Sequence, residues 1–407
     1  MDHFITLKKN KVETKLQKVA EQMTKELEKF ARENAQRDAY HFEKGICAIL
    51  KEGNHQFMQA LIGEIPKGEN SKVKIKTTMG EITVPKGHPL SSRPMDFGIS
   101  PCLQAHMCRL GSKLVFAEAS EEFMEFLDID ISDKQIERVC HCYGEKLEEL
   151  DWANAYSDSI QMKIDYKKDE PVYAMVDGSM LLTREEKWKE IKVGRVFGGH
   201  SLVDISKNRS LLTGSVYAAH LGTASKFWER FSAEIPPSDH LVFISDGAKW
   251  IWNYIHERYP NCIQILDFFH CKEHICQFSN KFFTSKEEAE QFAEELCAML
   301  LDEKVDGAIE KLKRLETRSE GKRKEKETLT GYLENNKERI NYGRFKKNGL
   351  LIGSGAIESA QRDVVQKRMK LSGQRWTIPG AQQIVNLRVY HKSGRWNRVI
   401  ETIKNAA

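Results

Sequence analysis

Three aspartates each follow a short apolar run in the middle of the sequence. Asp177, Asp246 and Asp267 come directly after runs that are typical of buried strands. Carboxylates at the C-terminal ends of neighbouring strands meet at one edge of a sheet, where open α/β sheets bind ligands. Carboxylates held together there repel one another unless a cation lies between them, and hard divalent cations prefer oxygen ligands. The pattern predicts a divalent-metal site. The alternative is that the Asp-Gly pairs at 177 and 246 are only turn dipeptides.

Glu358 is a fourth candidate acid. It lies in the segment GSGAIESA at 353–360, and we expect it in the first turn of a helix over 356–370. An anionic side chain is favoured in that turn because the N-terminal end of a helix carries partial positive charge. Asp177, Asp246 and Glu358 are thus the best candidates for a shared carboxylate site.

Alternating strands and helices must position these acids. We predict strands at 171–177, 193–205, 211–219, 241–246 and 262–267, and helices over 222–233, from 248 and from 268. This order predicts an α/β fold with a mixed sheet flanked by helices. Residues 285–344 are strongly charged and predicted to be all-helical, with an exposed loop at 321–328.

The N-terminal part is predicted to be mainly helical. Residues 1–70 begin with a charged helix that carries one apolar stripe over 10–35. Residues 71–170 contain a β-hairpin at 72–84 and three helical segments between 101 and 150, the last capped by Ser132. The last two helices are either a helix-turn-helix that reads DNA or a scaffolding pair.

Charge is segregated along the chain. The formal net charge of the 407 residues is only +4, but residues 121–170 hold 15 acidic and 6 basic side chains, and residues 361–407 hold 10 basic and 2 acidic ones. The basic C-terminal segment suggests a polyanionic partner, unless it is a chance cluster. The chain has nine cysteines in no evident paired framework, no secretory signal and no membrane-spanning apolar run, so we expect a soluble, cytoplasmic protein.

Four sequence blocks together resemble a known family. They are DGSMLLTREEKWKEIKVGRVF (177–197), SDGAKWIWN (245–253), LDFFHCKEH (266–274) and GSGAIESAQRDVVQKRMKLSGQRW (353–376). In this order they are similar to blocks of bacterial insertion-sequence transposases of the ISKra family, and the similarity covers residues 174–396. These belong to the DDE transposases, whose catalytic domain has the RNase H-like fold.

The resemblance implies a function for the acids. Asp177, Asp246 and Glu358 would be catalytic and hold two Mg²⁺ ions, for which Mn²⁺ could substitute, and Asp267 with His270 would form an accessory Asp-x-x-His motif. His270 either takes part in catalysis or is structural. The partners would be double-stranded DNA at the transposon ends and at the target, bound by a homodimer or a larger oligomer.

The resemblance also implies a division of the chain. Residues 171–284 and 345–407 would form the catalytic domain, and residues 71–170 would bind DNA ends. The 112 residues from Asp246 to Glu358 leave room for an insertion domain at 285–344, either contacting transposon-end DNA or acting as a lid. Such transposases often carry a zinc-type cysteine pair after the hairpin. This chain has no Cys-x-x-Cys there, so we expect no structural zinc.

Basic residues behind Glu358 are candidates for DNA binding. An α-helix would bring Arg362 beside Glu358 and thus near the metal site. The other basic side chains would follow the DNA backbone, and the tryptophan would either stack on an unpaired base or fill the core. The full set is Arg362, Lys367, Arg368, Lys370, Arg375 and Trp376.

Three functions remain open on the sequence. The first is an active DDE transposase that performs metal-dependent DNA cleavage and strand transfer. The second is a domesticated or inactive relative that binds DNA without cutting it. The third is a stand-alone metal nuclease acting on branched DNA or RNA hybrids.

Overall fold

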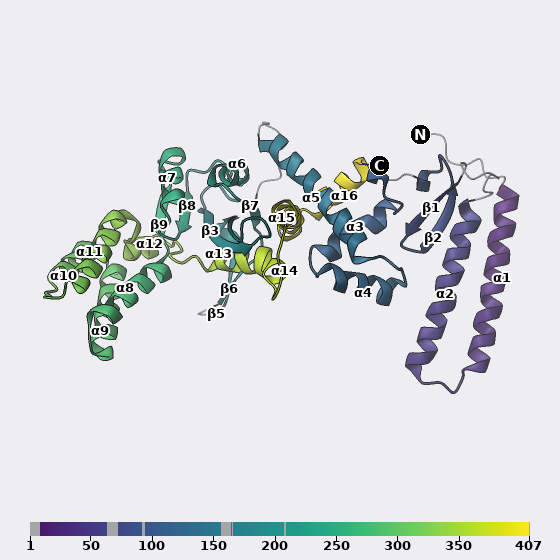
Figure 1. Cartoon of the computed structure of the whole chain (residues 1–407), viewed down its shortest axis with the longest axis horizontal. Helices are drawn as coiled ribbons and strands as arrows, with labels where there is room; N and C mark the ends of the chain where they lie inside the picture. The colour runs from purple at the N-terminus through teal and green to yellow at the C-terminus, as the bar shows by residue number, and fades with distance from the viewer. Residues whose placement is uncertain are drawn as a thin grey trace. The chain divides into compact units, whose positions relative to one another are not determined.

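Two compact units divide the chain in a computed structural model, which describes residues 9–62, 72–91, 94–155, 164, 166–206 and 209–406. Unit 1 comprises residues 1–143 and 397–407, and unit 2 comprises residues 144–396. Figure 1 shows their elements. None of the helices in the described ranges is long and apolar enough to span a membrane.

Unit 1 begins with a pair of helices, α1 (Lys9–Glu33) and α2 (Ala39–Ile62), that pack against each other. Their close approach depends on glycine, since a Cβ at Gly53 would lie 2.3 Å from the Met23 sulfur. The helix predicted over 10–35 is confirmed by α1. The predicted hairpin is confirmed by β1 (Lys72–Thr77) and β2 (Gly80–Pro85), whose buried Ile75 and Ile82 lie opposite each other.

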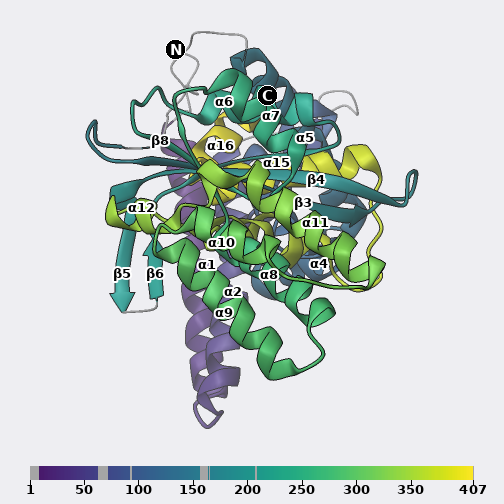
Figure 2. The ribbon, with the colours of Figure 1, turned by 90° about the vertical axis from the view of Figure 1, so that its left-hand side faces the viewer.

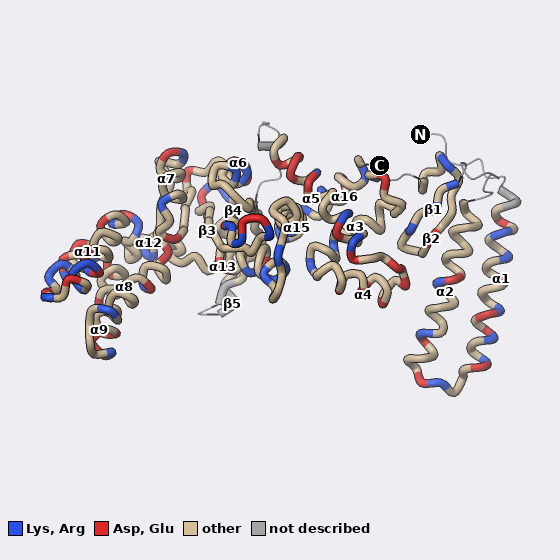
Figure 3. The backbone as a smooth tube through the Cα atoms, viewed as in Figure 1, with Lys and Arg blue, Asp and Glu red and all other residues tan. Residues whose placement is uncertain are grey.

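Three helices complete unit 1, as predicted for residues 101–150. The short 3-10 turns η2 (Pro89–Ser91) and η3 (Pro94–Asp96) lead to α3 (Pro101–Gly111), α4 (Phe116–Leu127) and α5 (Asp133–Ala155). The Ser132 hydroxyl caps α5 by accepting the Gln135 N–H at 3.3 Å. α5 passes into unit 2 after Tyr143, and acidic residues follow one another along its C-terminal half (Figure 3). The last helix is α16 (Trp396–Asn405).

Unit 2 contains the predicted mixed sheet, in the strand order β7-β4-β3-β8-β9. β3 pairs antiparallel with β4, β4 pairs antiparallel with β7, and β8 and β9 run parallel to β3. The strands are β3 (Val172–Leu182), β4 (Trp188–Gly198), β7 (Val216–Leu221), β8 (Leu241–Ser245) and β9 (Ile263–Leu266).

The predictions of single long strands at 193–205 and 211–219 are wrong. Each is broken: the first by the 3-10 turn η4 (Gly199–Ser201), the second by residues 213–215. The His200 N–H donates to the Glu170 carboxylate at 3.1 Å instead of to a neighbouring strand. The remaining pieces, β5 (Leu202–Ser206) and β6 (Arg209–Leu212), form a separate two-stranded sheet.

Helices cover both faces of the five-stranded sheet. In Figures 1 and 2, α6 (Ala224–Glu234) and α7 (Lys249–Arg258) lie on one side and α8 (Phe268–Phe282) on the other. α15 (Ile378–Lys392) packs against β7. Residues 172–176 and 241–245 are accordingly buried without alternation, as expected of strands covered on both faces.

The segment 285–344 is helical, as predicted. It contains α9 (Lys286–Leu301), α10 (Val305–Lys313), α11 (Glu320–Asn335), η5 (Lys337–Arg339) and α12 (Tyr342–Lys347). The prediction of an exposed loop at 321–328 is wrong, because these residues lie within α11. Ser319 caps this helix by accepting the Lys322 N–H, and the buried Leu329 and Leu333 anchor it.

The helix expected over 356–370 is not uniform. It consists of α13 (Gly355–Ala360), the π-helical segment η6 (Gln361–Gln366) and the short α14 (Lys367–Met369). Arg388 stabilises the π-helical segment by donating to the backbone carbonyls of Asp363 and Val364. A π-helix carries more residues per turn than an α-helix, so the spacing rules used for Arg362 do not hold here.

A buried ion pair offers a test of unit 2. Arg395 donates to both oxygens of Glu234, at 2.7 and 2.8 Å, and burial raises the pKa of Glu234 although Arg395 opposes this. We expect Arg395→Ala to lower the free energy of unfolding by about 3–5 kcal/mol, because it leaves a buried carboxylate unpaired. Arg398→Ala, which breaks an exposed pair with Glu401, should cost less than about 1 kcal/mol. Urea denaturation measures both, and equal losses would contradict the prediction.

Candidate functional site

The strand register brings three aspartates to one edge of the sheet. In the parallel pairs Val176 lies opposite Ser245, and Ser245 opposite Leu266. Asp177, Asp246 and Asp267 are therefore the next residues along three neighbouring strands. The Asp267 N–H also donates to the Ser245 carbonyl at 2.8 Å, which fixes the end of β9 against β8.

Glu358 is carried to the same edge by α13, which packs on β3 and β4. Gln361 fixes this helix: its amide nitrogen donates to the Asp177 carbonyl at 3.1 Å, and its oxygen accepts the Ser179 hydroxyl at 2.9 Å. Arg195 of β4 donates to the Ala356 carbonyl at 2.7 Å. The Glu358 side chain is exposed, and it lies in the first turn of its helix, as predicted.

The acids interact electrostatically. Burial and the charge of Asp246 raise the pKa of Asp177 from 3.8 to about 6, and the Glu358 charge adds to this. Hydrogen bonds from Gly178 and Gln361 act in the opposite direction. Burial lowers the pKa of Lys370, and the Asp177 charge opposes that shift, so the Lys370 ammonium group lies within electrostatic range of Asp177. Several carboxylates thus lie close together at this edge, with the positively charged Lys370 side chain near them.

The donor set fits a divalent cation in kind. It consists of carboxylate oxygens, which Mg²⁺ and Mn²⁺ prefer, and a cation would offset both the burial and the neighbouring charges that raise the pKa of Asp177. In the described ranges, no three His, Cys, Asp or Glu side chains are already gathered closely enough to hold an ion. Asp177 and Asp246 occupy neighbouring register positions. Among the three acids, it is Glu358 whose side chain is exposed.

Asp267 has a different environment from the other acids. Its side chain is buried, with one oxygen accepting the His270 N–H and the other accepting the Ser354 N–H. Both carboxylate oxygens are thus used by the backbone. We infer a structural role for Asp267 in the Asp-x-x-His motif rather than metal binding.

His270 belongs to a cluster that the sequence analysis did not identify. Its Nε2 lies 3.3 Å from Nε2 of His274, one turn further along α8. The His274 ring lies 4.5 Å from the Tyr332 ring, and burial, followed by the neighbouring His270, lowers the pKa of His274. The i, i+4 spacing of the two histidines was the available signal for His274. Tyr332 had none, because it comes from the helical insertion.

The predicted DNA-binding residues fall into two groups. Arg362, Lys367, Lys370 and Arg375 are exposed, and Lys367 forms an ion pair with Asp363 at 2.6 Å. The expectation that Arg362 lies next to the acids was based on α-helical spacing. The π-helical segment begins before that residue, and it is Gln361 that contacts Asp177.

The predictions for Arg368 and Trp376 are wrong, because both side chains are buried, at 1% and 8% exposure. The Arg368 guanidinium lies 5.0 Å from the centre of the Trp376 ring, and the indole N–H donates to the Met369 carbonyl. A β-bridge between Thr183 and Trp376 holds this segment against the sheet. Of the alternatives for Trp376, core filling is correct. Among the tryptophans in the described ranges, it is Trp188 that is exposed, at 61%.

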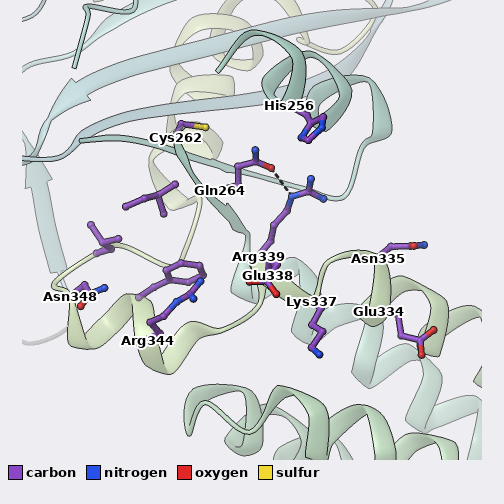
Figure 4. A pocket seen from close by; sticks show the side chains of 13 residues that line it. His256, Cys262, Gln264, Glu334, Asn335, Lys337, Glu338, Arg339, Arg344 and Asn348 are labelled. Atoms are coloured by element: carbon purple, nitrogen blue, oxygen red, sulfur yellow. Dashed lines mark hydrogen bonds between the residues drawn. The ribbon is translucent and has the colours of Figure 1, made fainter. Parts of the chain in front are cut away.

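A separate hollow lies beside the start of β9. This cavity of about 610 Å³ is lined by residues of α7, β9, η5 and α12, including Arg339, which donates to Gln264 at 2.9 Å (Figure 4). None of Asp177, Asp246, Asp267 and Glu358 lines it. The cavity flanks the beginning of the strand that ends at Asp267, so it is not part of the carboxylate site.

The raised pKa of Asp177 predicts that replacing its carboxylate increases the stability of the folded protein. The folded state binds a proton at Asp177 more tightly than the unfolded state, so folding loses free energy as the pH rises from about 4 to above 6. We expect Asp177→Asn to stabilise the metal-free protein at pH 8 by up to about 3 kcal/mol, since one pKa unit corresponds to about 1.4 kcal/mol. The gain should vanish at pH 4.

Urea denaturation in EDTA at both pH values measures this effect. Asp239→Asn, at an exposed position before β8, is the matched control and should change stability little at either pH. Equal destabilisation by Asp177→Asn at pH 4 and pH 8 would contradict the crowding of negative charge at this edge.

Comparison with known proteins assigns this chain to no family. No protein-family model matches this chain, and no curated protein matches it. The resemblance of the four sequence blocks to ISKra-type transposases therefore remains a prediction, and the functional conclusion depends on the carboxylate edge itself.

Proposed function

We propose that this chain is a DDE transposase that cleaves DNA at the ends of an insertion sequence and joins the freed ends to target DNA. One observation carries the proposal: Asp177 and Asp246 occupy neighbouring positions on parallel strands, and both Asp246 and Glu358 raise the pKa of Asp177. Two carboxylates on adjacent strands and a third on a helix suit the binding of two divalent ions.

The sheet topology supports the proposal. The first three strands of unit 2's large sheet are antiparallel neighbours. The fourth strand, β8, lies beside the first, β3, and parallel to it, and the fifth, β9, lies beside β8 and parallel to it. An RNase H-like fold has this strand order. Its acids also come from the first strand, the fourth strand and a late helix, as Asp177, Asp246 and Glu358 do here.

The chain's own residues would position the DNA and the acids. Divalent ions, when bound, would activate a water and stabilise the leaving oxygen. Asp177 and Asp246 are held in place by strand pairing, and Gln361 and Arg195 hold the helix that carries Glu358. Lys370 brings positive charge near Asp177, which suits a phosphate group at this edge.

Two reactions would follow at this site. In the first, water attacks a phosphorus atom at the element end, the P–O bond to the 3′ oxygen breaks, and a 3′-hydroxyl is released. In the second, that hydroxyl loses its proton and attacks a phosphorus atom of the target, displacing a target 3′ oxygen. No bond between protein and DNA forms in either step.

The helical insertion offers a surface for DNA. Arg314, Arg318 and Arg323 are exposed along a groove of about 1210 Å³ between the end of α10 and α11. In the described part of the chain no carboxylate pairs with these three, whereas the neighbouring Lys313 pairs with Glu334 at 2.8 Å. Basic and acidic residues alternate along this part of the insertion (Figure 3), and the groove lining also includes Glu316, Glu327 and Glu334. Free guanidinium groups along a groove are well suited to contact phosphates.

Removal of the acids should abolish cleavage. We expect Asp246→Asn and Glu358→Gln to slow nicking of a supercoiled plasmid that carries the gene with its native flanking DNA by at least about 1000-fold, or about 4 kcal/mol. EDTA should abolish nicking by the wild-type protein, and Mg²⁺ or Mn²⁺ should restore it. DNA binding and folding should persist in both variants.

Asp239→Asn is again the control, and it should nick at the wild-type rate. Normal nicking by Asp246→Asn would refute the assignment of the acids. Wild-type protein that binds the flanking DNA but never cuts it would point to a DNA-binding relative. Structure-selective cutting without joining would point to a nuclease.

The arginine groove predicts a change in salt dependence. Replacing Arg314, Arg318 and Arg323 together by Gln should weaken DNA binding and reduce the slope of log affinity against log salt by about one unit per lost phosphate contact. Fluorescence anisotropy across a NaCl series measures the slope. A triple Gln variant of Lys286, Lys304 and Lys347, each paired with a carboxylate, is the control. Equal slopes for wild type and the arginine variant would exclude this groove as a DNA contact.

A further inference from the structure

The cavity beside the start of β9 has the volume of a small-molecule site. It measures about 610 Å³, and residues of α7, β9, α11, η5 and α12 line it. Pockets that bind small molecules usually measure about 300–1,000 Å³. The side chains of His256, Asn335 and Asn348 on its lining are exposed, so a ligand can enter the cavity from solution.

Arg339 is a half-buried cation on the wall of this cavity. Its Nε donates to Oε1 of Gln264 at 2.9 Å, and its Nη1 donates to Oδ1 of Asn336 at 3.2 Å. The guanidinium also lies 4.5 Å from the centre of the Trp252 ring. Figure 4 shows the side chain extending towards Gln264. A guanidinium has five N–H donors, and these two hydrogen bonds to neutral groups leave donors for a ligand.

Among the described residues, no acid forms an ion pair with Arg339. Burial lowers the pKa of Arg339, and the opposing effect comes from the Cys262 thiol rather than from a carboxylate. Burial also raises the pKa of Cys262 to about 11, so this thiol is neutral at pH 7. A partly desolvated cation without a counter-charge is unfavourable. An anionic ligand in the cavity would supply that charge.

A second guanidinium, that of Arg344, lines the same cavity. It is exposed, lies 5.2 Å from the centre of the Phe345 ring and forms no ion pair with a carboxylate of the described ranges. Lys337 and Glu334 also line the cavity, but each pairs with a residue outside it, at 2.6 and 2.8 Å. Glu338 is the remaining acid of the lining. Two guanidinium groups and one carboxylate are thus left to interact with a ligand.

The other lining residues suit the organic part of a phosphate ester. Apolar side chains of Ile263, Phe345 and Leu350 offer a surface for a flat ring, and the amides of Asn335 and Asn348 offer hydrogen-bond donors and acceptors for its edge. Guanidinium groups bind phosphate through paired N–H donors. A nucleotide combines these three features, since it carries a phosphate group and a ring with polar edge atoms.

We propose that this cavity binds a free nucleotide, with Arg339 and Arg344 as the contacts to its phosphate group. A concave hollow suits a small molecule better than the convex backbone of a DNA duplex. Because residues of both β9 and η5 line the cavity, a bound nucleotide would hold the helical insertion to the sheet. The cavity is separate from the carboxylate edge, so this inference does not depend on the proposed function.

The test measures binding of AMP to the full chain by isothermal titration calorimetry at low salt. We expect adenosine, which lacks the phosphate, to bind at least about tenfold more weakly than AMP. Arg344→Gln should weaken AMP binding at least about tenfold, because it removes hydrogen bonds to a charged group at an exposed position. Arg339→Lys should weaken it similarly, since lysine keeps the charge but loses the planar fork. Arg258→Gln is the matched control, because this exposed arginine of α7 pairs with Glu257 and does not line the cavity.

Thermal unfolding provides a second measurement. AMP should raise the Tm of wild type and of Arg258→Gln, and it should raise the Tm of Arg344→Gln much less at the same concentration. The curves without AMP also show that each variant is folded.

Several results would overturn the proposal. They are no binding by wild type at about 1 mM AMP, equal affinities for AMP and adenosine, or equal AMP affinities of wild type and Arg344→Gln. Displacement of AMP by a short DNA duplex, together with weaker duplex binding by Arg344→Gln, would assign the cavity to the DNA backbone instead of a free nucleotide.

Discussion

The buried carboxylate of Asp267 joins the start of α8, which leads towards the helical insertion, to the start of α13, which follows it. One oxygen accepts the N–H of His270 at the start of α8, where the chain leaves the sheet, and the other accepts the N–H of Ser354, where it returns to α13. The Phe268 N–H also donates to the Ile352 carbonyl. Because one side chain fixes the origins of both helices, the positions of His274, Tyr332 and Glu358 all depend on it. Asp267 thus differs from its two neighbours at the sheet edge, because its side chain is buried and both of its oxygens accept backbone hydrogen bonds.

The carboxylates at the sheet edge next to Asp267 are electrostatically unfavourable without a bound cation. Asp177 is partly buried beside two other acids. Burial, followed by the charges of Asp246 and Glu358, raises its pKa, so folding loses free energy when Asp177 is ionised. Gln361 and the Gly178 N–H recover part of this loss by hydrogen bonding, and Lys370 adds a compensating charge. Packing alone would not require these carboxylates, since neutral residues could occupy the same positions at a lower cost in folding free energy. Local conflicts of this kind are expected at functional sites.

The sequence was sufficient for features that depend on local pattern. The buried strands that carry or precede Asp177, Asp246 and Asp267 follow from composition, and their shared edge follows from parallel pairing. The predicted strand end at Asp177 is wrong, because β3 continues to Leu182 in its antiparallel pairing with β4. The burial of Arg368 and Trp376 could not be predicted, because it depends on a bridge to Thr183, almost two hundred residues away in sequence. Residues 321–328 resembled a loop because they are highly charged, although the Ser319 cap and Leu329 favour a helix. Arg362 was misplaced because helical periodicity does not reveal a π-helical segment.

The insertion is better understood as part of the site than as an appendage. Closing a long segment between Asp246 and Glu358 carries an entropic penalty that grows only slowly with length, so its size alone argues neither for nor against a function. Its contacts are more informative. Tyr332 packs beside the backbone of Gly247, where a Cβ would lie 3.0 Å from its ring. The same segment that exposes Arg314, Arg318 and Arg323 thus also reaches the backbone beside Asp246.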